Sequence, residues 1–207
     1  MHFTYLGYNP RRFENSPLSP EEQREWGSDL LFAGHYEPRT EAGIVALLKA
    51  GLKVKVTGKD WSKAVNKDLL AGCFQDRYLS GEDYVRVLKA AKIGLCFVSE
   101  YNYNLTAARS LELPACGTFL LAMRTDQHLE LYDEGKEAEF FSDNDELVRK
   151  ARYYLDHDDE RRAIAARGHA RCVTSDYSYE RYMRDDWAAL LEAYHRDRKR
   201  AYAQIAV

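Results

Sequence analysis

The chain has 207 residues, of which 45% are hydrophobic and 30% are charged, and its formal net charge is −3. These values exclude disordered and fibrous classes and indicate a soluble globular protein of one or at most two domains. A chain of this length buries roughly 70% of the surface that its unfolded form exposes, so its core needs neither disulfides nor a structural metal. The 30 Lys and Arg are interspersed with 33 Asp and Glu, without the basic stripe that follows a nucleic-acid backbone, so we expect no nucleic-acid partner.

Membrane and metal classes are excluded on similar grounds. No apolar stretch approaches the ~20 residues that span a bilayer, so we expect no transmembrane segment. The N-terminus lacks the basic region and apolar run of a secretory signal, which predicts a cytoplasmic protein. The cysteines are unevenly spaced, without a C-x-x-C pair or a histidine cluster, so we expect them to be reduced and structural and the protein to hold no metal. They are Cys73, Cys96, Cys116 and Cys172.

From residue 29 onward, short apolar runs alternate with amphipathic segments. Strands are predicted at 29–34, 52–58, 93–98, 118–122 and 138–141. Helices are predicted from Thr40, over 62–70, 82–91 and 105–113, and near 145–155 and 159–171. Thr40 is expected to cap the first of these helices, and Pro114 to stop the helix over 105–113. Because strands separated by helices need crossover connections, we predict a doubly wound α/β domain with a parallel sheet and helices on both faces.

The two ends of the chain differ from this pattern. Residues 1–28 contain Pro10, Pro17 and Pro20 among many polar residues, which predicts an extended connector rather than a core element. At the other end, apolar residues recur at helical spacing and predict an apolar stripe on a long helix. The stripe consists of Met183, Trp187, Leu190, Leu191 and Tyr194. We therefore divide the chain into a linker over 1–28, a Rossmann-like domain over 29–177 and a C-terminal helix over 178–207.

The loop after the first predicted strand is a candidate ligand site, because ligands of doubly wound sheets bind beyond the carboxyl ends of the strands. This loop begins at Gly34 and includes Arg39. Glycine lets a phosphate approach the backbone, free N–H groups at a helix start can bind an anion, and Arg39 can add a bidentate clamp. The loop has neither a G-x-G-x-x-G nor a P-loop pattern, so ordinary turn chemistry is the favoured interpretation of the loop by itself.

Arg109 and Glu112 form a second candidate, three residues apart on one face of a predicted helix. A carboxylate can accept two hydrogen bonds from the vicinal hydroxyls of a ribose, and an arginine can pair with a diphosphate. The alternative for the same two residues is an ion pair on an exposed helix face.

The remaining reactive side chains predict no catalytic group. His35, His128 and His169 have no regular relation to one another or to an activated Ser or Cys, so each is interpreted as a loop histidine and no nucleophile triad is expected. Trp61 follows a predicted strand and either packs in the core or stacks on a base, and core packing is favoured.

Several stretches of the chain carry a family resemblance. They are Leu30–Gly34 with Arg39, Val56–Trp61, Ala91–Leu95, Thr106–Gly117 and Tyr132–Glu137, and the most specific part is 109–117. Their order resembles the C-terminal, donor-binding half of GT-B glycosyltransferases, in particular the bacterial group related to the spore-maturation protein CgeB. The resemblance covers residues 29–182.

The resemblance implies a nucleotide-sugar site. Glu112 matches the glutamate that such domains use on the donor ribose, and the segment 78–81 resembles the loop that receives the nucleobase. Many retaining relatives carry an earlier glutamate eight positions before the ribose glutamate, where this chain has Asn104. Diphosphate contacts are expected at Gly34, Arg39 and Arg109. The full set of implied nucleotide-sugar-binding residues is Gly34, Arg39, Tyr78, Leu79, Asn104, Thr106, Arg109 and Glu112.

The same resemblance implies that the chain is one half of an enzyme, with no catalytic residue of its own assigned. The donor would be a UDP-, GDP- or ADP-linked sugar, bound without a cofactor or a metal. The N-terminal connector resembles the linker that leaves an acceptor domain, and the C-terminal helix resembles the helix that crosses back to that domain, on the same or another chain. The alternative is a non-catalytic nucleotide-binding or partner-binding module of the same fold, whereas the missing glycine fingerprint disfavours an NAD enzyme.

Overall fold

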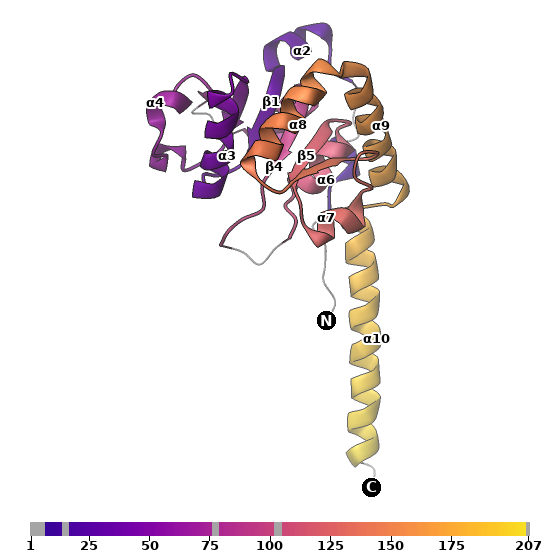
Figure 1. Ribbon diagram of the computed structural model, residues 1–207. Helices are drawn as coiled ribbons and strands as arrows, with labels where there is room; N and C mark the ends of the chain where they lie inside the picture. The colour runs from indigo at the N-terminus through magenta and orange to yellow at the C-terminus, as the bar shows by residue number, and fades with distance from the viewer. Residues whose placement is uncertain (1–6, 14–16, 76–78, 102–104, 206–207) are drawn as a thin grey trace.

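The central feature of the computed structural model is a parallel β-sheet (Figure 1), and the structure describes residues 7–13, 17–75, 79–101 and 105–205. The sheet has six strands in the order β3-β2-β1-β4-β5-β6. Their bounds are Ser28–Ala33 (β1), Val54–Thr57 (β2), Phe74–Gln75 (β3), Ala91–Cys96 (β4), Phe119–Met123 (β5) and Glu139–Phe141 (β6). Every pairing is parallel, which confirms the predicted doubly wound sheet. β3 is an addition, because two residues are too short to produce a readable pattern.

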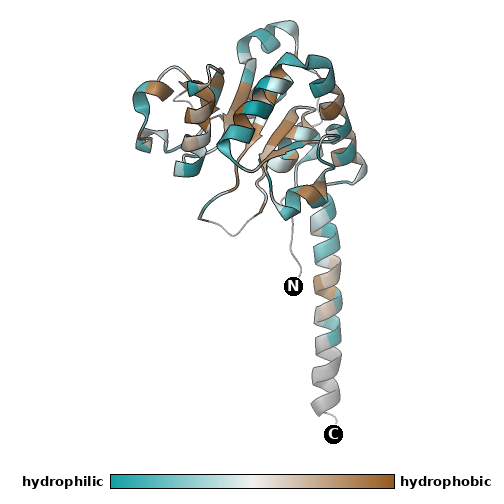
Figure 2. Ribbon diagram, viewed as in Figure 1, coloured by the Kyte–Doolittle hydropathy of each residue, from teal (hydrophilic) through white to brown (hydrophobic). Residues whose placement is uncertain are grey.

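Helices cover both faces of the sheet. They are α1 (Pro10–Phe13), α2 (Pro20–Trp26), α3 (Pro38–Lys49), the 3-10 helix η1 (Trp61–Lys63), α4 (Lys67–Leu70), α5 (Gly81–Ala90), α6 (Arg109–Ala115), α7 (Asp126–Leu131), α8 (Asn144–Asp156), α9 (Asp158–Thr174) and α10 (Tyr179–Ile205). Successive residues of β1 pack into two separate hydrophobic cores, one on each face of the sheet. Leu30 and Phe32 pack toward α3 and α8, whereas Leu31 and Ala33 pack toward α5 and α6. Figure 2 shows the resulting apolar colouring of the inner strands.

Strand β1 is the point at which the order of the sheet reverses. It pairs with β2 on one side and with β4 on the other, so that Leu30 lies beside both Val54 and Ile93. The loops that follow β1 and β4 therefore leave the sheet in opposite directions and leave a crevice between them. In sheets of this topology ligands commonly bind in such a crevice, so the candidate site is sought there.

Helix α6 differs from its prediction in both bounds. It begins at Arg109 rather than near Leu105, and it contains Pro114 instead of stopping there. Proline has no N–H for the carbonyl of Ser110, four residues earlier. The hydroxyl of Tyr132 donates to that carbonyl at 3.0 Å, so the helix continues for one more residue without an orphaned acceptor.

Two other helices also differ from their predicted bounds. The helix that Thr40 was expected to cap begins at Pro38, which is suited to a first helical position, and Glu37 is its N-cap residue. The predicted helix over 62–70 is split into η1 and α4. The break is held by the buried Glu41 carboxylate, which accepts the backbone N–H groups of Val65 at 2.9 Å and Asn66 at 2.6 Å.

The N-terminal segment is more ordered than an extended connector. It contains α1 and α2, and α2 begins with a capping box between Ser19 and Glu22. Tyr8, Phe13 and Trp26 are buried in the same core as Leu31, so their apolar surface outweighs the polar composition of the segment. The part of residues 1–28 that the structure describes is thus a wall of the domain.

Helix α10 extends away from the sheet (Figure 1), and its apolar stripe is exposed. Met183 is 71% exposed and Trp187 is 63% exposed. No helix among the described residues is both long enough and apolar enough to cross a membrane.

Candidate functional site

A polar cleft of about 470 Å³ opens at the carboxyl edge of the sheet, between the loops after β1 and β2 and the starts of α5 and α6. Its walls come from five separate segments of the chain. They are Arg12, Ala33, Gly34, His35, Thr57, Gly58, Lys59, Leu79, Ser80, Gly81, Tyr84, Ala108, Arg109 and Glu112.

The floor of the cleft is backbone, because two glycines bring the first two loops together. Gly34 donates its N–H to Thr57 at 2.8 Å, and its carbonyl accepts the indole N–H of Trp61 at 3.0 Å. Gly58 has a φ of +142°, and a Cβ there would collide with the Gly34 carbonyl. A Cβ on Gly34 would lie 2.8 Å from the Phe32 ring and 3.2 Å from the Arg109 guanidinium carbon. Glycine is therefore required at both positions for the loops and Arg109 to approach this closely.

Arg109 is the cation at the centre of this floor. Its guanidinium lies over the Phe32 ring, 5.5 Å from the ring centroid. Its Nε is buried and has no hydrogen-bond partner among the residues that the structure describes. Buried donors are nearly always paired in native proteins, so this nitrogen marks a place where an anionic ligand would complete the hydrogen bonding.

Glu112 lies one helical turn further along α6 and is held by Tyr84 of α5. The phenol of Tyr84 donates to Oε2 of Glu112 at 2.7 Å. Burial and the neighbouring Glu112 carboxylate raise the pKa of Tyr84 well above its ordinary value, so the phenol stays protonated and remains a donor. The bond orients the carboxylate and engages one of its two oxygens.

A smaller hollow of about 160 Å³ adjoins the cleft through His35, Ala108 and Arg109. Glu37 lines it and accepts the backbone N–H of Glu100 at 2.9 Å and the His35 ring nitrogen at 3.0 Å. Burial opposes ionisation of this carboxyl, but the hydrogen bonds from Glu100, Ser99 and His35 outweigh it and lower the pKa of Glu37. The hollow is therefore lined by an ionised acceptor.

The structure brings four of the predicted site residues together in the cleft: Gly34, Leu79, Arg109 and Glu112. Thr106 lines the adjoining hollow. Arg39 lines neither cavity, and its Nε pairs with Glu100 at 3.1 Å. Tyr78 and Asn104 lie outside the described residues.

Sequence reasoning missed Tyr84 and Arg12 as members of the site. Tyr84 falls within the helix predicted over 82–91, and the 15 tyrosines of the chain offer no way to single it out. Arg12 comes from the segment interpreted as a connector, and its place in the cleft depends on α1 packing against α5. Trp61, by contrast, is buried beside Phe32, Tyr36 and Phe74, which confirms its assignment to the core.

His128 is not the loop histidine that the sequence suggested. It lies in α7, fully buried, with Nε2 2.7 Å from the Ser110 hydroxyl and Nδ1 2.7 Å from the carbonyl of Met123. A serine and a histidine are thus paired, but the second ring nitrogen meets a backbone carbonyl rather than a carboxylate, and the pair is closed to solvent. The pair therefore joins α6 to α7 structurally and forms no nucleophile.

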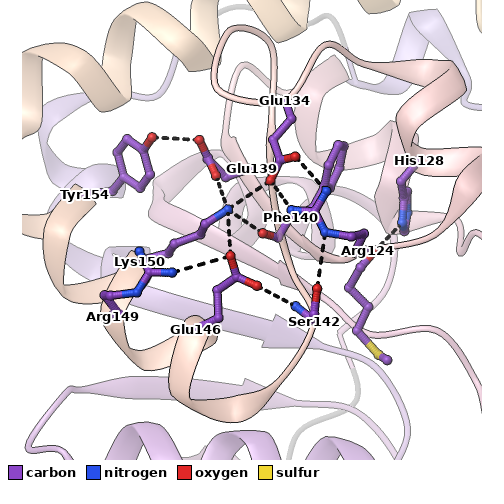
Figure 3. A network of polar contacts seen from close by, with 11 residues as sticks. Arg124, His128, Glu134, Glu139, Phe140, Ser142, Glu146, Arg149, Lys150 and Tyr154 are labelled. Carbon is purple, nitrogen blue, oxygen red and sulfur yellow. Dashed lines mark hydrogen bonds and ion pairs between the residues drawn. The ribbon is translucent and has the colours of Figure 1, made fainter.

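A second polar cluster surrounds Lys150 of α8 (Figure 3). Its ammonium group contacts Glu139 at 2.6 Å, Glu134 at 3.0 Å and Glu146 at 3.3 Å, and Arg124 also pairs with Glu134. Burial disfavours the charged lysine, but these carboxylates outweigh it and raise the pKa of Lys150. The cluster ties β6 to α8 and lines neither the cleft nor the adjoining hollow. In the described ranges, no group of three or more His, Cys, Asp or Glu side chains is arranged to hold a metal ion.

A parallel sheet of this order, with a cleft beside its switch point, defines a Rossmann-like α/β domain. The chain belongs to the glycosyl transferase-like family, whose sequence profile matches residues 39–201. No curated protein shows significant similarity to the sequence.

Solved structures of glycosyltransferases share the fold. Anabaena Alr3699/HepE in complex with UDP-glucose superposes with a TM-score of 0.71 at 12% identity, over 91% of this chain and 57% of that one. Sucrose-phosphate synthase from Thermosynechococcus elongatus gives 0.71 at 15% identity, over 92% and 52%. The C-terminal domain of the glycosyl transferase group 1 family protein LpcC from Francisella tularensis gives 0.64 at 15% identity, over 84% of this chain and 100% of that domain. The chain thus has the fold of one GT-B half and spans little more than half the length of two of these relatives.

Proposed function

We propose that this chain is the donor-binding domain of a glycosyltransferase and that its cleft binds a nucleoside diphosphate sugar. The observation that carries the proposal is the buried Nε of Arg109, which has no hydrogen-bond partner in the described part of the chain. It lies beside the glycine floor, within the same cleft as the oriented carboxylate of Glu112. A cation beside exposed backbone suits a diphosphate, and a carboxylate suits a ribose diol. Similar folds have been solved with UDP-glucose and with UDP, which supports this class of ligand.

In this proposal, each part of the donor has a place. The diphosphate lies over Gly34 and contacts Arg109, the ribose hydroxyls reach Glu112, and the sugar extends toward the hollow that Thr106 lines. Arg39 receives no contact, because it is paired with Glu100. Arg109 would stabilise the negative charge that develops on the leaving nucleoside diphosphate, without a metal ion.

The acceptor domain belongs to the proposal as well, because the chain spans little more than half the length of HepE and of sucrose-phosphate synthase. We assign the acceptor site and any general base to an N-terminal domain on the same or another chain, and the exposed stripe of α10 to contact with that domain. We further propose that the chain falls within the group related to the spore-maturation protein CgeB.

Calorimetric titration with UDP, GDP and ADP tests the donor site. We expect at least one of them to bind with a dissociation constant of about 1 mM or below. Glu112→Gln should weaken that binding about tenfold, because a neutral amide replaces a charged acceptor, while the melting temperature stays the same. Glu25→Gln, which removes the same charge from the exposed face of α2, is the matched control. Absence of binding by all three nucleotides would refute the proposal.

A second candidate function is a non-catalytic module that keeps the fold and binds a partner through α10. The exposed stripe favours it, since large apolar patches on a surface commonly mark interaction sites. Calorimetry together with light scattering separates the two. A module of this kind should self-associate or bind a partner and bind no nucleotide, whereas a donor domain should bind nucleotide whatever its state of association.

A further inference from the structure

A series of side chains links Gly34 to Arg12 in the cleft, through close contacts and one turn of α6. At one end, Arg109 lies against Gly34. In the middle, Tyr84 donates to Glu112 at 2.7 Å. At the other end, the guanidinium of Arg12 lies 5.8 Å from the centroid of the Tyr84 ring, and its Nη2 donates to the carbonyl of Gly81 at 2.9 Å.

Arg12 is held at that end by its own helix. Its neighbour Phe13 is 2% exposed and meets the ring of Tyr84 edge to face, with centroids 6.4 Å apart. The guanidinium lies over both rings, 5.4 Å from the centroid of Phe13. The bond to Gly81 uses one of the five N–H groups of a planar, always charged side chain. Arg12 therefore presents a positioned donor edge to the cleft that it lines.

The order of these groups along the cleft suits the parts of a nucleotide. A diphosphate at Arg109 and a ribose at Glu112 leave the base at the far end, beside Gly81 and Arg12. A guanidinium can stack on a base or donate to its edge. At the position of O4 in uracil and O6 in guanine, which accept hydrogen bonds, adenine carries the N6 amine, which donates. An arginine that donates at this position loses its acceptor when the base is adenine.

We propose that Arg12 is a specificity-determining residue of the donor site, which selects a donor whose base carries a carbonyl oxygen over an adenine nucleotide. This inference rests on the proposed function, because it takes the ribose to lie at Glu112 and the diphosphate at Arg109. The inference assigns a ligand contact to the segment N-terminal to the sheet. The same segment then forms a wall of the site and selects the base of the donor.

The test compares UDP, GDP and ADP on the full chain by calorimetry, with variants at neighbouring arginines. The wild type should bind UDP or GDP at least tenfold more tightly than ADP. Arg12→Ala and Arg12→Lys should each bring this ratio toward one, and Arg12→Lys keeps the charge and so separates edge recognition from simple attraction to phosphate. Arg11→Ala is the matched control, because Arg11 is exposed on the same helix and lines no part of the cleft. Circular dichroism confirms that each variant is folded.

The outcomes are distinguishable. If the wild type binds with the expected preference and the Arg12 variants retain it, the assignment of Arg12 is overturned while the donor site stands. If Arg12→Ala weakens all three nucleotides equally, Arg12 is a phosphate contact and the assignment is again overturned. If the wild type binds UDP, GDP and ADP equally, the site does not select a base, and the assignment of Arg12 is overturned. If it binds none of them, both the donor site and the inference fail.

Discussion

His128, the buried histidine of α7, predicts how the free energy of unfolding depends on pH. Met123 offers only a carbonyl oxygen to Nδ1 of His128, so Nδ1 carries the proton and Nε2 accepts from Ser110. The Ser110 oxygen in turn accepts the backbone N–H of Ala107 at 3.0 Å, which leaves its own proton for the histidine. A second proton on the ring would bind Nε2 and would have to displace the Ser110 hydroxyl hydrogen, inside a site that water does not reach.

The magnitude follows from the pKa of His128. Burial lowers this pKa from 6.5 to about 4. Between these values the unfolded chain binds a proton that the folded protein does not, so the free energy of unfolding falls as the pH falls. The contribution is fully present above pH 6.5 and is lost by about pH 4, a total of about 3 kcal/mol. About 2 kcal/mol of it is lost between pH 6.5 and 5, above the range in which acidic side chains such as Glu37 titrate.

Urea unfolding at several pH values measures this change. The wild type should lose about 2 kcal/mol between pH 6.5 and 5, and His128→Gln should be less stable at pH 7 but nearly flat across the same interval. His195→Gln, which removes an exposed histidine of α10, should keep the slope of the wild type. The reasoning is refuted if the wild type is flat between pH 6.5 and 5, or if His128→Gln shows an unchanged slope.

Two further substitutions test the floor of the cleft and the polar cluster of Figure 3. Gly58→Ala should lower the free energy of unfolding by about 2 kcal/mol or more and should weaken nucleotide binding, because a Cβ at this φ meets the Gly34 carbonyl. Chemical denaturation measures the loss of stability. The control Gly72→Ala should show no comparable loss, because Gly72 has open space around it. Lys150→Met should cost about 3 kcal/mol, because it leaves the buried Glu139 beside two other carboxylates without its cation. Equal stability of Lys150→Met and an exposed control such as Lys49→Met would contradict this account of the cluster.

The sequence by itself determined the fold class. The apolar runs around Leu30 and Ile93 are continuous, as expected for strands covered on both faces, and amphipathic helices separate them. Alternation of this kind permits only parallel strands with crossover helices, and those place the ligand at the carboxyl edge. Gly34, Arg109 and Glu112 were therefore assigned to one site from local pattern and resemblance.

Only the tertiary structure decided which side chains meet there. Arg39 looks equivalent to Arg109 in the sequence, but a carboxylate from a distant loop, Glu100, holds it outside the cleft. Arg12 is in the cleft because Phe13 packs beneath Tyr84, and neither contact has a local signal. Sequence periodicity reports the neighbours of a residue along one element, whereas a site is assembled from the ends of several elements, whose contacts are set by the packing of the whole domain.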